Sequence, residues 1–412
     1  MTFFKPTRTL PERPSLEYLK KEAKRLLVAY RQQNAEAVAF VEQFEQKPDA
    51  STLTLQDAQR ILARGYGFAR WTRLKLYLAT NAIKRGDHEY LRAVVSQSSN
   101  PAALLSAKID WEDRDGHPIG QGLTLLQLAS FRPWKQDTAS TLRSLGAKLD
   151  LHSACGLGDV EAIANFLQTD AAAIENQVDT YYPLQFAITG GKPEAVRALL
   201  QFGDDANRAI KKVCWFVWED DAVSNNQMEW KPTHMATLWG LDETRNSIVG
   251  VLKGYGADLD ACSPLHGYRP IHLAAMSGKV DVIRFLLANG VNVDSRSHRW
   301  QPMNGIELED WSSIGGYDWT PLMVAAGEGH QAVVDLLIDG GADLNAINSL
   351  GQTSLHFAAA AFWRENLGIV RSLVAGGANV AMKDNEERRP VDMAVSKGFM
   401  ETAELLLRQL RE

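Results

Sequence analysis

The sequence predicts an all-α solenoid of stacked helical pairs, and two observations carry this prediction. A short motif recurs along the chain, most clearly as RPIHLAA at residues 269–275 and as TPLMVAA at residues 320–326. Each clear copy is followed by a glycine-containing turn, an amphipathic run and the tripeptide Gly-Ala-Asp or a close variant. A repeat of this kind cannot bury its own apolar face, so it is stable only when it stacks on its neighbours.

The local chemistry of each copy predicts a helix, a turn and a second helix. Proline at the first helical position gives up no hydrogen bond, and a preceding threonine can cap the free amide groups. Gly329 and Gly398 suit the left-handed residue that ends a first helix. Apolar residues at helical spacing within 280–288 then supply the buried face of a second helix.

Eight copies can be aligned on this opening, and a ninth, degenerate unit lies near residues 82–96. The starts at Thr320 and Thr353 are 33 residues apart. The eight copies begin near Thr124, Leu149, Tyr182, Lys231, Arg269, Thr320, Thr353 and Arg389. We therefore predict eight or nine helix-turn-helix units.

In its 33-residue spacing, its motif and its turn chemistry, this unit resembles the ankyrin repeat. The resemblance covers roughly residues 81–412, and it implies a solenoid whose units are joined by finger-like loops. It also implies that the chain binds a partner along the concave surface formed by the fingers and the first helices. His272 and His356 stand at the motif histidine, which in ankyrin-like units usually makes hydrogen bonds across repeats rather than serving a metal or catalysis.

The N-terminal part of the chain has a different pattern that predicts four helices. The first begins behind Ser15, and the second spans about residues 35–44. A capping sequence at Thr54 opens the third helix, and the fourth carries Trp71. We expect these helices to cover the open end of the solenoid, because an uncovered end exposes apolar surface.

Residues 57–74 are similar to a helical segment that precedes ankyrin repeats in many bacterial proteins. This resemblance implies no activity. We predict two domains, a helical cap over residues 1–80 and an ankyrin-repeat solenoid over residues 81–412.

Composition excludes several function classes. The net charge of −6, with no cluster of Lys and Arg to offset it, argues against nucleic acid as a partner. Three scattered cysteines favour a reducing compartment, and the sequence shows neither a signal peptide nor a membrane-spanning run. No phosphate-binding loop, nucleophile elbow or zinc-binding helix occurs. We therefore predict a cytoplasmic protein with no cofactor, no metal and no membrane partner.

Two fingers are much longer than the repeat requires, and they are the candidate binding elements. They lie at residues 208–231 and 294–319, and a third irregular finger spans residues 108–123. Together these segments hold seven of the eleven tryptophans, accompanied by many carboxylates. Insertions in a repeat array fall in loops on one face, which is often the binding face.

Three interpretations of these tryptophans compete. They could form small cores that hold the long fingers together, which is the commonest fate of the residue. They could instead be ligand anchors, with the acids selecting a basic or polar partner. The candidate ligand-binding residues are Trp215, Trp218, Trp230, His266, Tyr268, His298, Trp300, Trp311, Asp318 and Trp319. In the third interpretation, two carboxylates in a cleft between the long fingers perform acid–base chemistry. The carboxylates available for such a pair are Glu219, Asp220, Glu307 and Asp310.

We predict a binding protein whose ligand is a protein or peptide, or another polar molecule. The alternatives are a small-molecule binder or an enzyme, either a lyase or cyclase or one with glycoside-hydrolase-like chemistry, working in the cleft between the long fingers.

Overall fold

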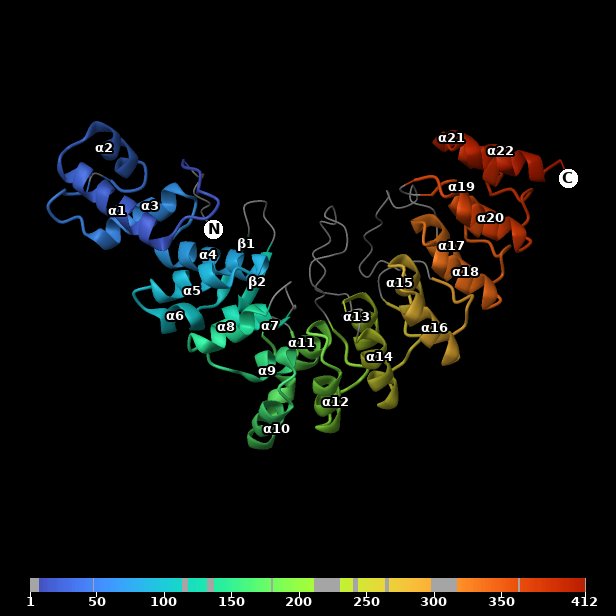
Figure 1. Ribbon diagram of the computed structural model, residues 1–412, viewed down its shortest axis with the longest axis horizontal. Helices are drawn as coiled ribbons and strands as arrows, with labels where there is room; N and C mark the ends of the chain where they lie inside the picture. Colours follow the sequence, from blue (N-terminus) through green and yellow to red (C-terminus); the bar gives the residue numbers. More distant parts are fainter. Residues whose placement is uncertain are drawn as a thin grey trace, which may run out of the picture. The chain divides into compact units, whose positions relative to one another are not determined.

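The computed structural model describes residues 7–46, 48–112, 118–131, 137–178, 181–210, 230–239, 244–263, 267–297, 317–361 and 364–411. These residues divide into two compact units, and Figure 1 labels the helices and strands of both. One unit consists of residues 1–162 and 177–179, and the other of residues 163–176 and 180–412. The chain passes from the first unit to the second within one helix, at residues 162–163.

The first unit is helical apart from one pair of strands. Its elements in chain order are α1 (Leu16–Arg31), α2 (Ala35–Glu42), α3 (Leu55–Gly65), α4 (Trp71–Arg85), α5 (His88–Ser96), α6 (Pro101–Ser106), β1 (Ile109–Glu112), β2 (Pro118–Leu123), α7 (Leu125–Phe131), α8 (Thr138–Ser144) and α9 (Leu151–Leu157). The four predicted N-terminal helices are α1 to α4, although α2 ends two residues earlier than expected. Ser15 caps α1 by accepting a hydrogen bond from the amide of Tyr18. Thr54 and Asp57 form a reciprocal capping box at α3.

The strands occupy the irregular finger at residues 108–123. β1 and β2 pair in antiparallel fashion, with Ile109 opposite Leu123. Both of these side chains are buried. The finger therefore has an apolar base, and this small hairpin is the one departure from helix within the described part of the first unit.

The second unit is a stack of helical pairs. Its elements are α10 (Val160–Thr169), which begins at the end of the first unit, the 3-10 helix η1 (Ala171–Glu175), α11 (Pro183–Thr189), α12 (Pro193–Gln201), α13 (Pro232–Trp239), α14 (Arg245–Gly254), α15 (Pro270–Met276), α16 (Val280–Ala288), α17 (Pro321–Glu328), α18 (Gln331–Asp339), α19 (Ser354–Ala359), α20 (Leu367–Ala375), α21 (Pro390–Lys397) and α22 (Met400–Gln409). From α11 onward, each odd-numbered helix packs on the next odd-numbered helix, and each even-numbered helix on the next even-numbered one. The predicted all-α solenoid is confirmed.

The repeat motif positions the first helices as expected. All eight predicted starts are followed by a helix, with α9 beginning behind Asp150, one residue later than the expected cap. Ala325 and Ala326 are completely buried between neighbouring first helices. Such small side chains let helix axes approach closely, so larger ones there would separate the pairs. Gly329 ends α17 with φ 86°, a left-handed conformation that a side chain would strain.

The predicted boundary between a cap of residues 1–80 and a solenoid of residues 81–412 falls inside α4. In the first unit α4 and α5 form a helical hairpin, and α4 packs on α7 and α5 on α8. The position of that boundary stays a prediction. Among the described helices, none combines the length and the apolar character that crossing a membrane requires.

Candidate protein-interaction surface

The loops between a second helix and the next first helix form one continuous surface on the second unit. We define the finger surface as residues 294–297, 317–320, 343–353 and 379–389. These segments come from three consecutive fingers, and each ends at the cap of a first helix, α17, α19 or α21. The helical stack therefore sets the spacing of the fingers.

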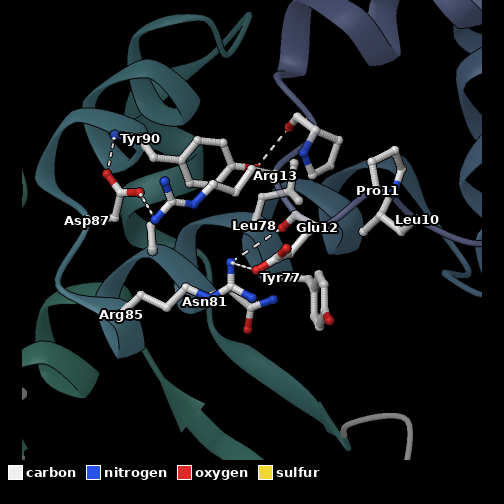
Figure 2. A pocket seen from close by; sticks show the side chains of 12 residues that line it. Leu10, Pro11, Glu12, Arg13, Tyr77, Leu78, Asn81, Arg85, Asp87 and Tyr90 are labelled. Atoms are coloured by element: carbon white, nitrogen blue, oxygen red, sulfur yellow. Dashed lines mark hydrogen bonds and ion pairs between the residues drawn. The ribbon is translucent and has the colours of Figure 1, made fainter.

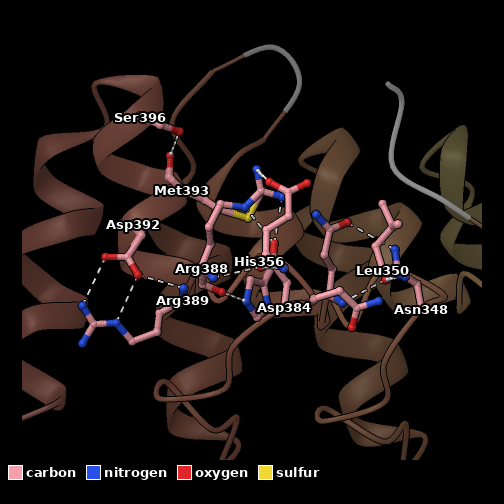
Figure 3. A network of polar contacts seen from close by, with 12 residues as sticks. Asn348, Leu350, His356, Asp384, Arg388, Arg389, Asp392, Met393 and Ser396 are labelled. Carbon is pink, nitrogen blue, oxygen red and sulfur yellow. Dashed lines mark hydrogen bonds and ion pairs between the residues drawn. The ribbon is translucent and has the colours of Figure 1, made fainter. Parts of the chain in front are cut away.

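A single side chain organises the turn in each of the last two fingers (Figure 3). Asn348 accepts hydrogen bonds from the amides of Leu350 and Gln352 through Oδ1, at 3.0 and 2.8 Å. Asp384 accepts equivalent bonds from the amides of Glu386 and Arg388, at 3.0 and 2.9 Å. Asn348 and Asp384 thus have the same role in successive repeats, because each satisfies backbone donors that the tight turn leaves without a partner.

Buried histidines tie three of the fingers to the first helix that precedes each of them. Nδ1 of His234, His272 and His356 accepts a hydrogen bond from the backbone amide of its own helix cap. This bond makes Nε2 the protonated nitrogen, which donates to a backbone carbonyl of the next finger. The acceptors are Ala261, Trp319 and Arg388, at 2.9, 2.9 and 3.1 Å. The expected cross-repeat role of the motif histidine is confirmed.

The ionisation states of these histidines and of Asp384 fit the hydrogen bonds that they make. Desolvation lowers the pKa of His234 to about 4, and it also lowers the pKa of His356. Both rings are therefore neutral near pH 7, as the accepting Nδ1 requires. For Asp384, burial alone raises the pKa of the carboxyl, but hydrogen bonds from the Arg388 side chain and from the backbone of Arg388 and Glu386 outweigh it and lower the pKa. Asp384 is therefore a carboxylate paired with Arg388 at 2.8 Å.

Hydrogen bonds also join neighbouring fingers edge to edge. The amide of Ser349 donates to the carbonyl of Tyr317 at 3.0 Å, and the amide of Tyr317 donates to Oγ of Ser349 at 2.9 Å. Farther along, the amide of Asn385 donates to the carbonyl of Leu350 at 2.9 Å. Arg296 bridges two fingers, since its guanidinium donates to the carbonyls of Asp318 and Ile347 at 3.0 and 2.5 Å. The finger surface is thus held rigidly.

Two apolar side chains stand exposed on this rigid support. Tyr317 is 39% exposed and Ile347 is 47% exposed. Asp318 has φ 64°, a left-handed conformation that aspartate tolerates better than most residues. In an extended strand, residues 317 and 319 would face the same side. The turn at Asp318 instead leaves Tyr317 outside and Trp319 buried, so it separates a surface side chain from a core one.

The described aromatic candidates lie at the bases of the fingers, directly before the helix caps. Trp230 and Trp319 are buried, and Tyr268 is half-buried. The ring of Trp230 meets His234 edge-on at 5.6 Å between centroids, and Tyr268 stacks on His272 at 5.7 Å. Trp230 also pairs with Ile210 through two backbone hydrogen bonds, which closes the base of the long finger at residues 208–231. Here these aromatic rings pack against the helical stack, and a ligand-binding role for them stays a prediction.

The other sequence candidates lie outside the described residues. The ligand-binding candidates among them are Trp215, Trp218, His266, His298, Trp300 and Trp311, and the catalytic candidates are Glu219, Asp220, Glu307 and Asp310. The structure thus brings together Tyr268, Asp318 and Trp319 from the predicted set. Within the described residues, no three His, Cys, Asp or Glu side chains converge in a way that could hold a metal ion.

A separate hollow of about 100 Å³ lies on the first unit, where residues 10–14 cross α4 and the start of α5 (Figure 2). Arg13 pairs with Asp87 at 3.2 Å, and the hydroxyl of Tyr90 donates to the carbonyl of Pro14 at 2.8 Å. These contacts tether the N-terminal segment to the helices. The hollow is a by-product of that tether and shares no residue with the finger surface.

Comparisons with known proteins agree with this architecture. The family described as ankyrin repeats (3 copies) matches residues 234–348, 303–384 and 322–411 in three overlapping placements. This part of the chain therefore consists of ankyrin repeats. The bacterial type suggested by the N-terminal segment stays a prediction.

Several curated proteins are similar to this chain over parts of their length. Human transient receptor potential cation channel subfamily A member 1 is 25% identical over 290 residues, which cover 60% of this chain and 26% of the channel. A probable 26S proteasome regulatory subunit p28 of Saccharomyces cerevisiae is 30% identical over 142 residues, 34% of this chain and 54% of the relative. The E3 ubiquitin-protein ligase KEG of Arabidopsis thaliana is 31% identical over 122 residues, 29% of this chain and 6% of the ligase. The chain thus spans about half or less of these relatives.

The two exposed apolar residues were missed by the sequence reasoning. Tyr317 lies inside the predicted long finger, two residues before Trp319, and only the tryptophan was predicted to bind a ligand. Ile347 belongs to a finger of ordinary length, and nothing in the local pattern distinguishes it from a buried residue.

Proposed function

We propose that this protein binds another protein through the finger surface of its second unit. The observation that carries the proposal is the exposure of Tyr317 and Ile347 on adjacent fingers that hydrogen bonds hold together. Apolar side chains presented on rigid backbone lose little entropy when they are covered, so they are efficient contact residues. Ankyrin repeats generally serve as protein-interaction modules, which supports the same function.

The charges around these residues favour a partner segment that is basic or neutral. Asp343 is exposed, and its amide is held by the carboxylate of Asp294 on the preceding finger. The carboxylates farther along, Glu386 and Glu387, already pair with Arg388 and Lys383. We infer that a partner inserts an apolar side chain near Tyr317 and Ile347 and places basic or polar groups toward the two aspartates.

The predicted anchors in the long fingers belong to the same proposal. Trp218 and Trp311 lie in the two long fingers, outside the described residues, and we propose them as further contact residues on the basis of the sequence alone. The proposed location is the cytoplasm, in keeping with the scattered thiols, of which Cys155 is buried and Cys262 exposed.

Affinity capture with a matched control tests the proposal. The full chain and the variant Tyr317→Ala/Ile347→Asp are used as baits, and retained proteins are identified by mass spectrometry. Val28→Asp is the control, because Val28 is an exposed apolar residue on α1 of the first unit. We expect partners that bind the wild type and Val28→Asp equally and are lost with the finger variant. A set of retained proteins that is the same for all three baits would refute the proposal.

A further inference from the structure

The last helical pair of the second unit, α21 and α22, exposes a face that is covered in the earlier pairs. Ala326 of α17 and Ala359 of α19 are completely buried at the same repeat position, and each of these helices packs on the first helix of the following pair. The equivalent residue of α21 is Val395, which is 54% exposed. A small buried residue is thus replaced by a larger apolar side chain that no part of the described chain covers.

An internal comparison shows which side of α22 belongs to this face. In α18, Gln331 donates to Oγ of Ser372 in α20 at 2.9 Å, and it also contacts Asp335 one turn along. The stripe of α18 that holds residues 331, 335 and 338 therefore faces the next pair. Counted from the turn glycines Gly329 and Gly398, the equivalent stripe of α22 holds residues 400, 404 and 407.

This stripe adds two exposed apolar residues to the face. Met400 is 64% exposed and Leu407 is 42% exposed. We define the end face as Val395, Met400 and Leu407. A helical face that water covers is ordinarily polar. Apolar residues grouped on such a face indicate a surface that another element covers.

We propose that the end face binds the end face of a second copy of this chain, with the two α22 helices antiparallel. The end face is the side on which a repeat accepts another helical pair, so a second helical pair fits it in shape. A twofold arrangement lets each copy use the same surface, which is the commonest way in which identical chains associate.

The charge order along α22 selects this occupant and this orientation. Glu401 and Glu404 lie in the first half of α22, whereas Arg408 lies in its last turn and Arg411 follows two residues after its end. In an antiparallel pair, the acids of one copy lie beside the arginines of the other, and Leu407 lies close to the twofold axis. In a parallel pair, like charges meet. The long stem of Arg411 also covers Met400 of the other copy, as arginine stems do on apolar surfaces.

The test is the mass of the full chain in solution, measured by sedimentation equilibrium over about a hundredfold range of concentration. We expect a monomer–dimer equilibrium for the wild type. Met400→Glu should weaken the dimer by at least about tenfold, because it places a charge where an apolar side chain is covered. Val28→Glu on α1 is the matched control and should dimerise like the wild type.

A charge exchange tests the orientation independently of folding. Glu404→Arg should weaken the dimer, because it faces Arg408 of the other copy, and Glu404→Arg/Arg408→Glu should restore it. The same order of charges also suits the dipole of a single helix. Circular dichroism therefore checks that each variant keeps its helical content. A monomeric wild type at every concentration would overturn the proposal and leave the end face to a different protein. Equal dimerisation of Met400→Glu, or equal loss with Val28→Glu, would overturn it as well.

Discussion

Replacement of Trp319 by alanine should reveal how far the bases of the fingers stabilise the second unit. The backbone of Trp319 exchanges hydrogen bonds with Ser297 and accepts one from His272 of the preceding repeat. Its indole meets Phe357 of the following repeat edge-on, with 5.0 Å between ring centroids. The ring centroid of Tyr268 lies 6.4 Å away on the other side. One residue therefore connects three consecutive repeats.

The expected cost follows from this burial. Truncation of a buried tryptophan to alanine costs about 3–5 kcal/mol, because it removes apolar contact and leaves a cavity. About 0.5–1.5 kcal/mol of this loss belongs to the edge-on pair with Phe357. Since a folded domain is stable by only about 5–15 kcal/mol, Trp319→Ala should lower the stability of the second unit severely.

Urea titrations followed by circular dichroism measure this loss, and a double-mutant cycle with Phe357→Leu isolates the ring pair. Ile347→Ala is the control, because Ile347 is exposed on the neighbouring finger and should change stability by less than about 0.5 kcal/mol. If Trp319→Ala costs no more than Ile347→Ala, the indole is not a structural element of the finger base, and the reasoning is wrong.

Three further predictions concern the fingers. Burial holds the folded-state pKa of His234 and His356 below the unfolded value of about 6.5, so the contribution of these histidines to stability is present above that pH. The urea midpoint of unfolding should therefore fall as the pH decreases from about 6.5 toward 4. A midpoint that does not change with pH would contradict the neutral-histidine bridges. Asp384→Ala should lower the free energy of unfolding by about 1–3 kcal/mol, because it leaves turn amides without an acceptor. Asp384→Asn should lower it much less, since an asparagine, Asn348, organises the equivalent turn in the preceding finger. Equal losses for the two variants in chemical denaturation would count against this reasoning. From the sequence, Trp218→Ala and Trp311→Ala should abolish partner capture and leave the thermal midpoint nearly unchanged, and unfolding of both variants would favour a purely structural role.

Much of the scaffold follows from sequence alone, for local reasons. The caps at Ser15 and Thr54, the proline that opens α17 and the glycine that ends it are decided by residues within one turn of each other. A period of 33 residues then implies stacking, because no single pair can bury its apolar face. The resemblance to the ankyrin repeat also implied the cross-repeat bonds of His272 and His356.

Only the tertiary structure decided which aromatic side chains lie inside and which lie outside. Tyr317 and Trp319 are two residues apart in one finger, yet the left-handed turn at Asp318 leaves the first exposed and the second buried. The side chain of Ile347 is exposed, and its backbone carbonyl is held by Arg296, which is far away in sequence and bridges two fingers. Val395 is likewise exposed although the residues at the same repeat position, Ala326 and Ala359, are completely buried. Helix starts and turns depend on neighbours along the chain, whereas exposure depends on neighbours in space.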